Sequence, residues 1–71
     1  MNCNFNKLKG RIVEVLGTRE AFCEKMGFTH ATLYNTFKGK RDFTSSEIDK
    51  ACDILGLEGK DIPTYFFNKN N

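Results

Sequence analysis

The sequence predicts an all-α fold in one small domain. Apolar residues recur at the three- and four-residue spacing of an amphipathic helix in several windows, and no run of β-branched residues alternates with polar ones. Proline occurs once, at Pro63. The 71 residues suffice for one hydrophobic core, because a second core would need roughly 50 to 100 more. We therefore expect a single domain over residues 1–71 with an ordered core over residues 5–67.

The first two helices are predicted from an apolar stripe and a cap. The first helix ends at Gly17, which can adopt the left-handed conformation that closes helices. Its inward stripe is Phe5, Leu8, Ile12 and either Val15 or Leu16. Thr18 supplies an N-cap oxygen for a second helix over residues 19–26, about two turns long. The apolar positions of that helix are Ala21, Phe22, Cys23 and Met26.

The third helix follows after a very short turn. Gly27 ends the second helix, and Thr29 is the N-cap candidate of the third. We expect the third helix to point Leu33 and Phe37 inward and to stop before the basic loop that follows. At about 100° per residue, Thr36 lies on the flank of this helix, so Phe37 is expected to take over its packing.

The fourth helix opens with a capping box formed by Thr44 and Glu47. Its inward residues are Ile48, Ala51, Cys52 and Leu55. A short last helix is expected around Asp61 and Pro63, because proline is favoured in the first turn of a helix. The polar tail over residues 68–71 is expected to fray.

The cysteines and the hydropathy indicate a cytoplasmic protein without a metal. Cys3, Cys23 and Cys52 are an odd number at wide spacing, which argues against a disulfide framework and a closed zinc site. We interpret them as a free N-terminal thiol and two core thiols. No segment has the length of a membrane span or the apolar run of a signal peptide. With a single histidine and no paired carboxylates or phosphate loop, we expect no enzyme, no cofactor and no small-molecule substrate.

The charge is divided unevenly along the chain. Residues 1–41 contain eight Lys or Arg and three Glu, whereas residues 42–71 contain three Lys and six Asp or Glu. A basic half of this kind is typical of a surface that faces a polyanion, but a solvated surface gives the same pattern. Lys7, Lys9 and Arg11 point around the first helix rather than along one face, so we assign them to solvation.

The junction between the second and third helices carries the functional signal. A tight turn that sets two helices at roughly 90 to 120° leaves one face of the second helix free, which suits the DNA major groove. The predicted outward face of the third helix is Ala31, Asn35 and Lys38, flanked by Thr32 and Tyr34. No Asp or Glu occurs between residues 29 and 41. A helical hairpin used only for packing is the alternative.

The run TREAFCEKMGFTHATLYNTFKGKRDF resembles the helix-turn-helix of lambda-repressor-like and Cro-like phage regulators. The whole chain, from FNKLKGRIVE through IPTYFF, is similar to small prophage-encoded repressor-like proteins of Gram-positive bacteria. The resemblance implies five short helices around one core, with the third helix in the major groove of an operator. It implies a sequence-specific DNA-binding regulator, acting as a repressor or Cro-like protein by operator occupancy.

The resemblance also implies which residues contact DNA. The start of the second helix would hold a backbone phosphate, the third helix would contact bases, and the following loop would touch phosphates. The positions at the start of the second helix are Thr18 and Arg19. Those of the third helix are Thr29, His30, Ala31, Thr32, Tyr34 and Asn35, and those of the loop are Lys38, Lys40 and Arg41. Asn35 can pair with adenine, and methyl groups on this face can contact thymine, so we expect an A·T-rich half-site.

The C-terminal segment allows two interpretations. Its residues Ile62, Tyr65, Phe66 and Phe67 are too apolar to face water. They either close the core or form a self-association patch. The family binds paired half-sites as dimers, and a homodimer would place them about 34 Å apart. The rival function is a protein-interaction module, an antirepressor or adaptor, that holds another protein through the surface of residues 65–67.

Overall fold

The computed structural model describes residues 5–67, and these residues form five α-helices and one 3-10 helix without any strand. In chain order the elements are α1 (Asn6–Leu16), α2 (Arg19–Met26), α3 (His30–Phe37), α4 (Ser45–Leu55), η1 (Gly59–Asp61) and α5 (Ile62–Phe66). The all-α prediction is therefore confirmed. The expected fraying of residues 68–71 and the thiol of Cys3 lie outside the described residues.

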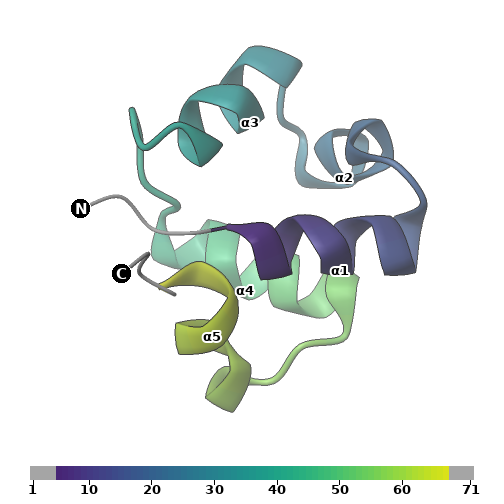
Figure 1. The fold of residues 1–71 in the computed structure, drawn as a ribbon, viewed down its shortest axis with the longest axis vertical. Coiled ribbons are helices and arrows are strands. Elements are labelled where there is room, and N and C mark those ends of the chain that lie inside the picture. The colour runs from purple at the N-terminus through teal and green to yellow at the C-terminus, as the bar shows by residue number, and fades with distance from the viewer. Residues whose placement is uncertain (1–4, 68–71) are drawn as a thin grey trace.

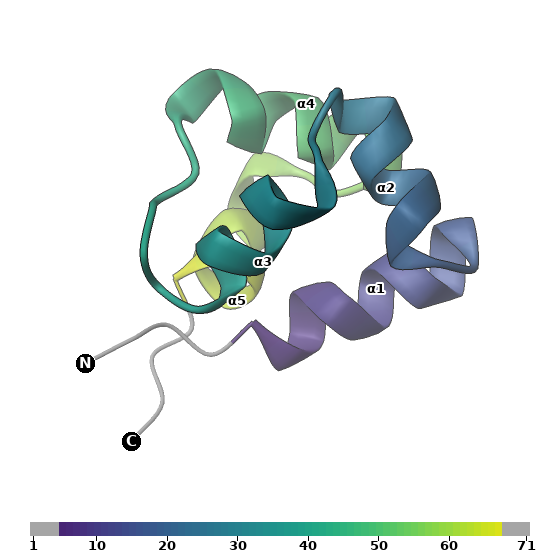
Figure 2. The same cartoon turned by 90° about the horizontal axis from the view of Figure 1, so that it is seen from above.

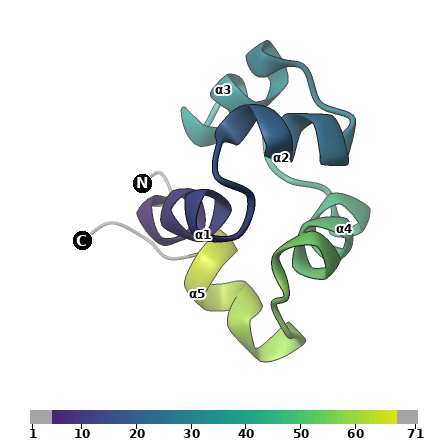
Figure 3. The same cartoon turned by 90° about the vertical axis from the view of Figure 1, so that its right-hand side faces the viewer.

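Helix α1 lies between the α2–α3 pair and α5. It contacts α2, α4 and α5, and Figures 1 and 3 show α2 and α3 on one side of it and α5 on the opposite side. In the view from above, no other element crosses in front of α3 (Figure 2). The arrangement thus leaves α3 on the outside of the domain. None of the helices within residues 5–67 combines the length and the apolar character needed to cross a membrane.

Three threonines begin the helices where the sequence predicts. The hydroxyl oxygens of Thr18 and Thr29 accept hydrogen bonds from backbone N–H groups three residues later, each at 3.1 Å. Thr44 and Glu47 form the predicted capping box, in which each side chain accepts from the other residue's backbone N–H. Each such cap contributes about 1 kcal/mol of stability, so these caps fix the boundaries of α2, α3 and α4.

The core contains one residue that the helical spacing places wrongly. Thr36 is fully buried, at 0% exposure, while Phe37 is only half-buried against the core. The prediction of Thr36 on a flank is therefore wrong. In α1, Val15 is 42% exposed and Leu16 packs against the core, which decides between the two alternatives. The buried apolar residues are Phe5, Leu8, Ile12, Phe22, Cys23, Met26, Leu33, Ile48, Ala51, Cys52, Leu55 and Phe66.

Phe43, in the loop between α3 and α4, joins several elements through its ring. Its ring centroid lies 5.3 Å from that of Phe66, 5.9 Å from Phe5 and 6.3 Å from Phe28. Aromatic pairs at such distances contribute about 0.5 to 1.5 kcal/mol beyond the area that they bury. The loop after α3 is therefore anchored in the core, and it holds the C-terminal end of α3 against the rest of the domain.

Candidate functional site

The turn between α2 and α3 is closed by backbone hydrogen bonds. Gly27 has φ +77°, and its N–H donates to the carbonyls of Cys23 and Glu24, while the Phe28 N–H donates to Cys23 at 2.8 Å. A left-handed residue with this pairing is a helix C-cap that favours glycine. Only Phe28 separates Gly27 from Thr29, the N-cap of α3. The direction in which α3 leaves α2 is therefore set locally.

The α3 surface is uncharged along most of its length and ends in cations. Ala31 and Tyr34 are exposed, Tyr34 at 59%, and Asn35 is half-buried. His30 in the first turn and Lys38, the residue that caps the C-terminal end of α3, are exposed as well. Thr32 is half-buried, and its hydroxyl lies 2.9 Å from that of Thr29. This face offers small, aromatic and amide groups with no carboxylate.

Arg41 has internal partners that the sequence does not reveal. Its guanidinium donates two hydrogen bonds of 2.9 Å to the carboxylate of Glu47 and one of 2.7 Å to the hydroxyl of Thr36. The Thr36 hydroxyl in turn donates to the backbone carbonyl of Thr32 at 2.8 Å. The Arg41 guanidinium also lies 5.5 Å from the ring centroid of Phe28. These contacts direct the charge of Arg41 toward α4.

The same contacts lower the pKa of Glu47. Burial on its own would raise the pKa, but the hydrogen bonds from the Thr44 backbone and from Arg41, together with the positive charge of Arg41, outweigh it. The carboxylate is therefore held ionised. Arg41, Glu47 and Thr36 form a polar link between the end of α3 and the start of α4, which we call the α3–α4 link.

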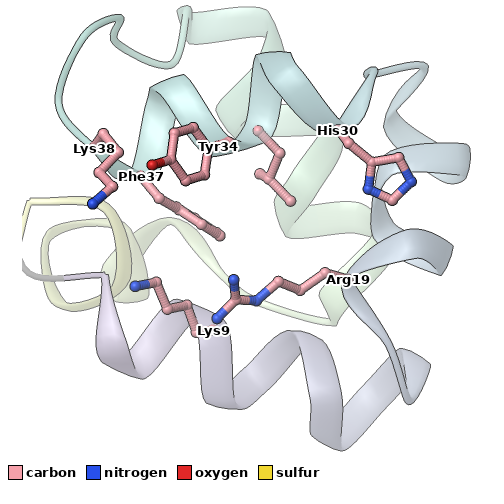
Figure 4. A pocket seen from close by; sticks show the side chains of 7 residues that line it. Lys9, Arg19, His30, Tyr34, Phe37 and Lys38 are labelled. Atoms are coloured by element: carbon pink, nitrogen blue, oxygen red, sulfur yellow. The ribbon is translucent and has the colours of Figure 1, made fainter.

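A groove of about 490 Å³ lies between α1 and α3. Its lining residues are Lys9, Arg19, His30, Leu33, Tyr34, Phe37 and Lys38, and we call it the α1–α3 groove. Figure 4 shows Lys9 and Arg19 reaching toward the ring of Phe37 from below it. The Lys9 ammonium lies 5.2 Å and the Arg19 guanidinium 5.6 Å from that ring centroid, within the range of cation–π attraction.

Comparison with known proteins places this chain in a family. A family model described as "Protein of unknown function (DUF739)" matches residues 1–69. The chain belongs to the DUF739 family. Among solved structures, it is similar to the solution structure of the modulator of repression (MOR) of the temperate bacteriophage TP901-1 from Lactococcus lactis, with 35% identity and a TM-score of 0.76. That match covers 100% of this chain and 97% of the other. No curated protein matches the chain.

Sequence reasoning missed the place of Lys9 in this DUF739 chain. The residue lines the α1–α3 groove, whereas Arg11 in the same helix donates to the Leu55 carbonyl at 3.0 Å and pairs with Glu14. No spacing within α1 distinguishes these two cations. The signal is tertiary, because it depends on Phe37 of α3 lying across from Lys9. Only the assembled domain shows which basic residues of α1 remain available to a ligand.

The C-terminal segment of the DUF739 chain packs on the core at three of its four predicted positions. Phe66 is buried, at 2% exposure, and Ile62 and Tyr65 pack half-buried against the core. Phe67 is 55% exposed. Three of these four aromatic and aliphatic side chains therefore serve packing. A self-association surface at this end would have Phe67 as its apolar contact.

The two described cysteines lie in the core as the sequence predicts. Burial raises the pKa of Cys23, with the charge of Glu20 adding to the effect. Burial likewise raises the pKa of Cys52, and Asp49 adds to it. A raised pKa keeps a thiol protonated and unreactive. Within residues 5–67 no three His, Cys, Asp or Glu side chains come together as metal ligands.

Proposed function

We propose that this DUF739 chain is a phage regulatory protein that modulates repression. The observation that carries the proposal is its 35% identity to the TP901-1 modulator of repression, over the full length of this chain and nearly all of the other. At this identity and coverage a shared role is the simplest interpretation.

The α2–α3 unit is proposed to act as a lambda-repressor-like helix-turn-helix that binds duplex DNA. Three features support this: the hydroxyl cap at Thr18, the left-handed Gly27 in a short turn, and the exposure of α3. Ala31 and Asn35 supply a methyl group and an amide toward base edges. A homodimer would bring two such helices to paired half-sites.

The phosphate contacts are proposed for Arg19, Lys38 and Lys40, which are exposed. Arg41 is left out, because its guanidinium is bound to Glu47. Three phosphate contacts predict that log K falls with log salt at a slope of about −2.7 per chain, at about 0.9 per contact. Fluorescence anisotropy with duplex fragments from the chain's own locus, at several salt concentrations, measures this slope.

Two variants separate base readout from phosphate contact. Asn35→Ala is expected to weaken operator binding by about 1 to 3 kcal/mol and random duplex very little. Lys40→Ala is expected to weaken both duplexes alike. Equal losses on both duplexes for Asn35→Ala would remove Asn35 from base readout. Failure of the unaltered chain to bind any duplex at low salt would overturn the DNA-binding proposal.

A second candidate is a protein-interaction module that acts on a repressor. The name of the similar structure favours it, since a modulator of repression need not itself occupy an operator. The half-burial of Asn35 and the internal engagement of Arg41 also leave fewer groups for DNA than the sequence implies. Binding that barely responds to salt, measured with a purified repressor from the same locus, would support this candidate over the first.

A further inference from the structure

We propose that the α1–α3 groove docks an acidic segment of a partner protein, with one apolar side chain of that segment inserted and its carboxylates on the rim. This docking does not require the DNA binding proposed above. It assigns the groove to a protein ligand, and two residues that line the groove, Arg19 and Lys38, are also proposed phosphate contacts.

The floor of the groove is apolar and has room for a side chain. Leu33 is 3% exposed and Phe37 is half-buried, so the apolar surface of the floor comes mainly from the ring of Phe37. The volume of about 490 Å³ falls within the range of roughly 300 to 1,000 Å³ typical of ligand pockets. A leucine or phenylalanine side chain would bury this surface.

The rim of the groove is positively charged. Lys9 and Arg19 stand over the ring of Phe37, and the Lys38 ammonium lies 5.4 Å from the ring centroid of Tyr34. Among the described residues that line the groove there is no carboxylate. Across the described part of the chain, the ion pairs involve Arg11, Arg41 and Lys60, and none involves the three rim cations. The charge of the rim is therefore available to an incoming acid.

An acidic protein segment satisfies the floor and the rim together. Carboxylates meet the rim cations, and an apolar side chain covers Phe37, as when an amphipathic helix lies in a groove. A DNA duplex presents phosphates and sugar to such a concave surface, with its base faces stacked inside. It would satisfy the rim and leave the floor uncovered. The combination of floor and rim therefore favours a protein ligand.

The test uses a synthetic helix-forming peptide of about twelve residues, in which Leu and Phe lie one turn apart between Glu residues. Fluorescence anisotropy with the full chain measures its affinity, and amide chemical shifts of the chain locate its site. We expect binding, with the largest shifts at Lys9, Arg19 and Phe37. The matched peptide with Gln in place of each Glu is expected to bind at least fivefold more weakly, since one close charge pair is worth about 1 kcal/mol.

Two charge reversals decide whether the groove itself binds. Lys9→Glu is expected to weaken the peptide at least fivefold, because it places a negative charge on the rim. Lys25 is exposed at the end of α2, outside the groove. The Lys25→Glu chain has the same net charge as the Lys9→Glu chain, and we expect its affinity for the peptide to change less than twofold. Lys9→Gln serves as a milder variant, and circular dichroism checks that each variant is folded.

Duplex DNA provides the opposite comparison. Lys9→Glu is expected to weaken the duplex less than the peptide, because Lys9 is not itself a proposed phosphate contact although Arg19 lies over the same ring. Lys40→Ala is expected to weaken the duplex while leaving the peptide unchanged. Equal loss of duplex and peptide for Lys9→Glu would assign the groove to nucleic acid and overturn the proposal. No peptide binding at about 1 mM, or equal effects of Lys9→Glu and Lys25→Glu, would also overturn it. A chain that binds the peptide but no duplex would refute only the DNA-binding proposal.

Discussion

Replacing Glu47 by Gln tests the α3–α4 link most directly. The Glu47 carboxylate accepts two hydrogen bonds of 2.9 Å from Arg41 and one of 2.9 Å from the Thr44 N–H. Glutamine keeps the shape and one accepting oxygen, but it loses the ion pair and at least one of these bonds. A charged hydrogen bond contributes about 1.5 to 3 kcal/mol, whereas an exposed ion pair contributes about 0 to 1 kcal/mol.

The partial exposure of Arg41 and Glu47 determines how much stability Glu47→Gln is expected to lose. The side chains of Arg41 and Glu47 are 30% and 23% exposed, so water screens the pair in part. We expect Glu47→Gln to lower the free energy of unfolding by about 1 to 2 kcal/mol at pH 7. For a domain of this size that corresponds to about 4 to 16 °C in Tm. Urea denaturation followed by circular dichroism measures the change.

The pH dependence gives the same variant a second readout. Because the folded-state pKa of Glu47 is lowered, its contribution is present above the unfolded pKa and is lost as pH falls through the folded pKa. The unaltered chain should therefore lose its advantage over Glu47→Gln in acid. Glu24→Gln, at an exposed position of α2, is the control and should stay within about 0.5 kcal/mol. A deficit for Glu47→Gln that persists unchanged in acid would refute the ionic account of the link.

Three further predictions concern the backbone, the buried hydroxyl and the thiols. Gly27→Ala should lower the free energy of unfolding by about 1 to 2 kcal/mol because of the positive φ at that position. Gly10→Ala, on the exposed surface of α1, should raise it by about 0.8 to 1 kcal/mol. Neither added Cβ meets an atom within 4 Å, so a destabilised Gly10→Ala would contradict the reasoning. Thr36→Val should cost about 1 to 3 kcal/mol in urea denaturation, because Arg41 keeps its charge and loses an acceptor; a neutral result would show that the hydroxyl is dispensable. In a Cys3→Ser background, the two buried thiols should react with a disulfide reagent far more slowly in the folded chain than in urea, and equal rates would refute their burial.

The helix boundaries could be predicted because their causes are local. Thr18, Thr29 and Thr44 each bond a backbone N–H three residues away, so a short stretch of sequence contains both partners. The ring of Phe43 could not be placed in this way. It lies in a loop without periodicity, and its partners Phe5 and Phe66 are distant along the chain. A pattern of spacing carries no information about such contacts.

The candidate site was only partly predictable for the same physical reason. Helical spacing identified α3 as the outward helix and Ala31 as exposed. It placed Thr36 on a flank from the angle of about 100° per residue alone, which takes no account of the hydrogen bonds that allow a hydroxyl to be buried. Its two partners are the Thr32 carbonyl of the same helix and the guanidinium of Arg41 in the next loop. The burial of Thr36 is thus a consequence of where Arg41 folds back.

The positive charge that the basic half presents to a ligand therefore cannot be obtained by counting residues in the sequence. Its cations divide according to what faces them in the folded chain. Arg11 and Arg41 are paired with the carboxylates of Glu14 and Glu47, which reduces the net positive charge that they present to a distant anion. Lys9 stands over an aromatic ring, which leaves its charge uncompensated. The positions of the carboxylates determine which cations remain unpaired. The positive surface that an anionic ligand meets is therefore smaller than the excess of lysine and arginine in residues 1–41 implies.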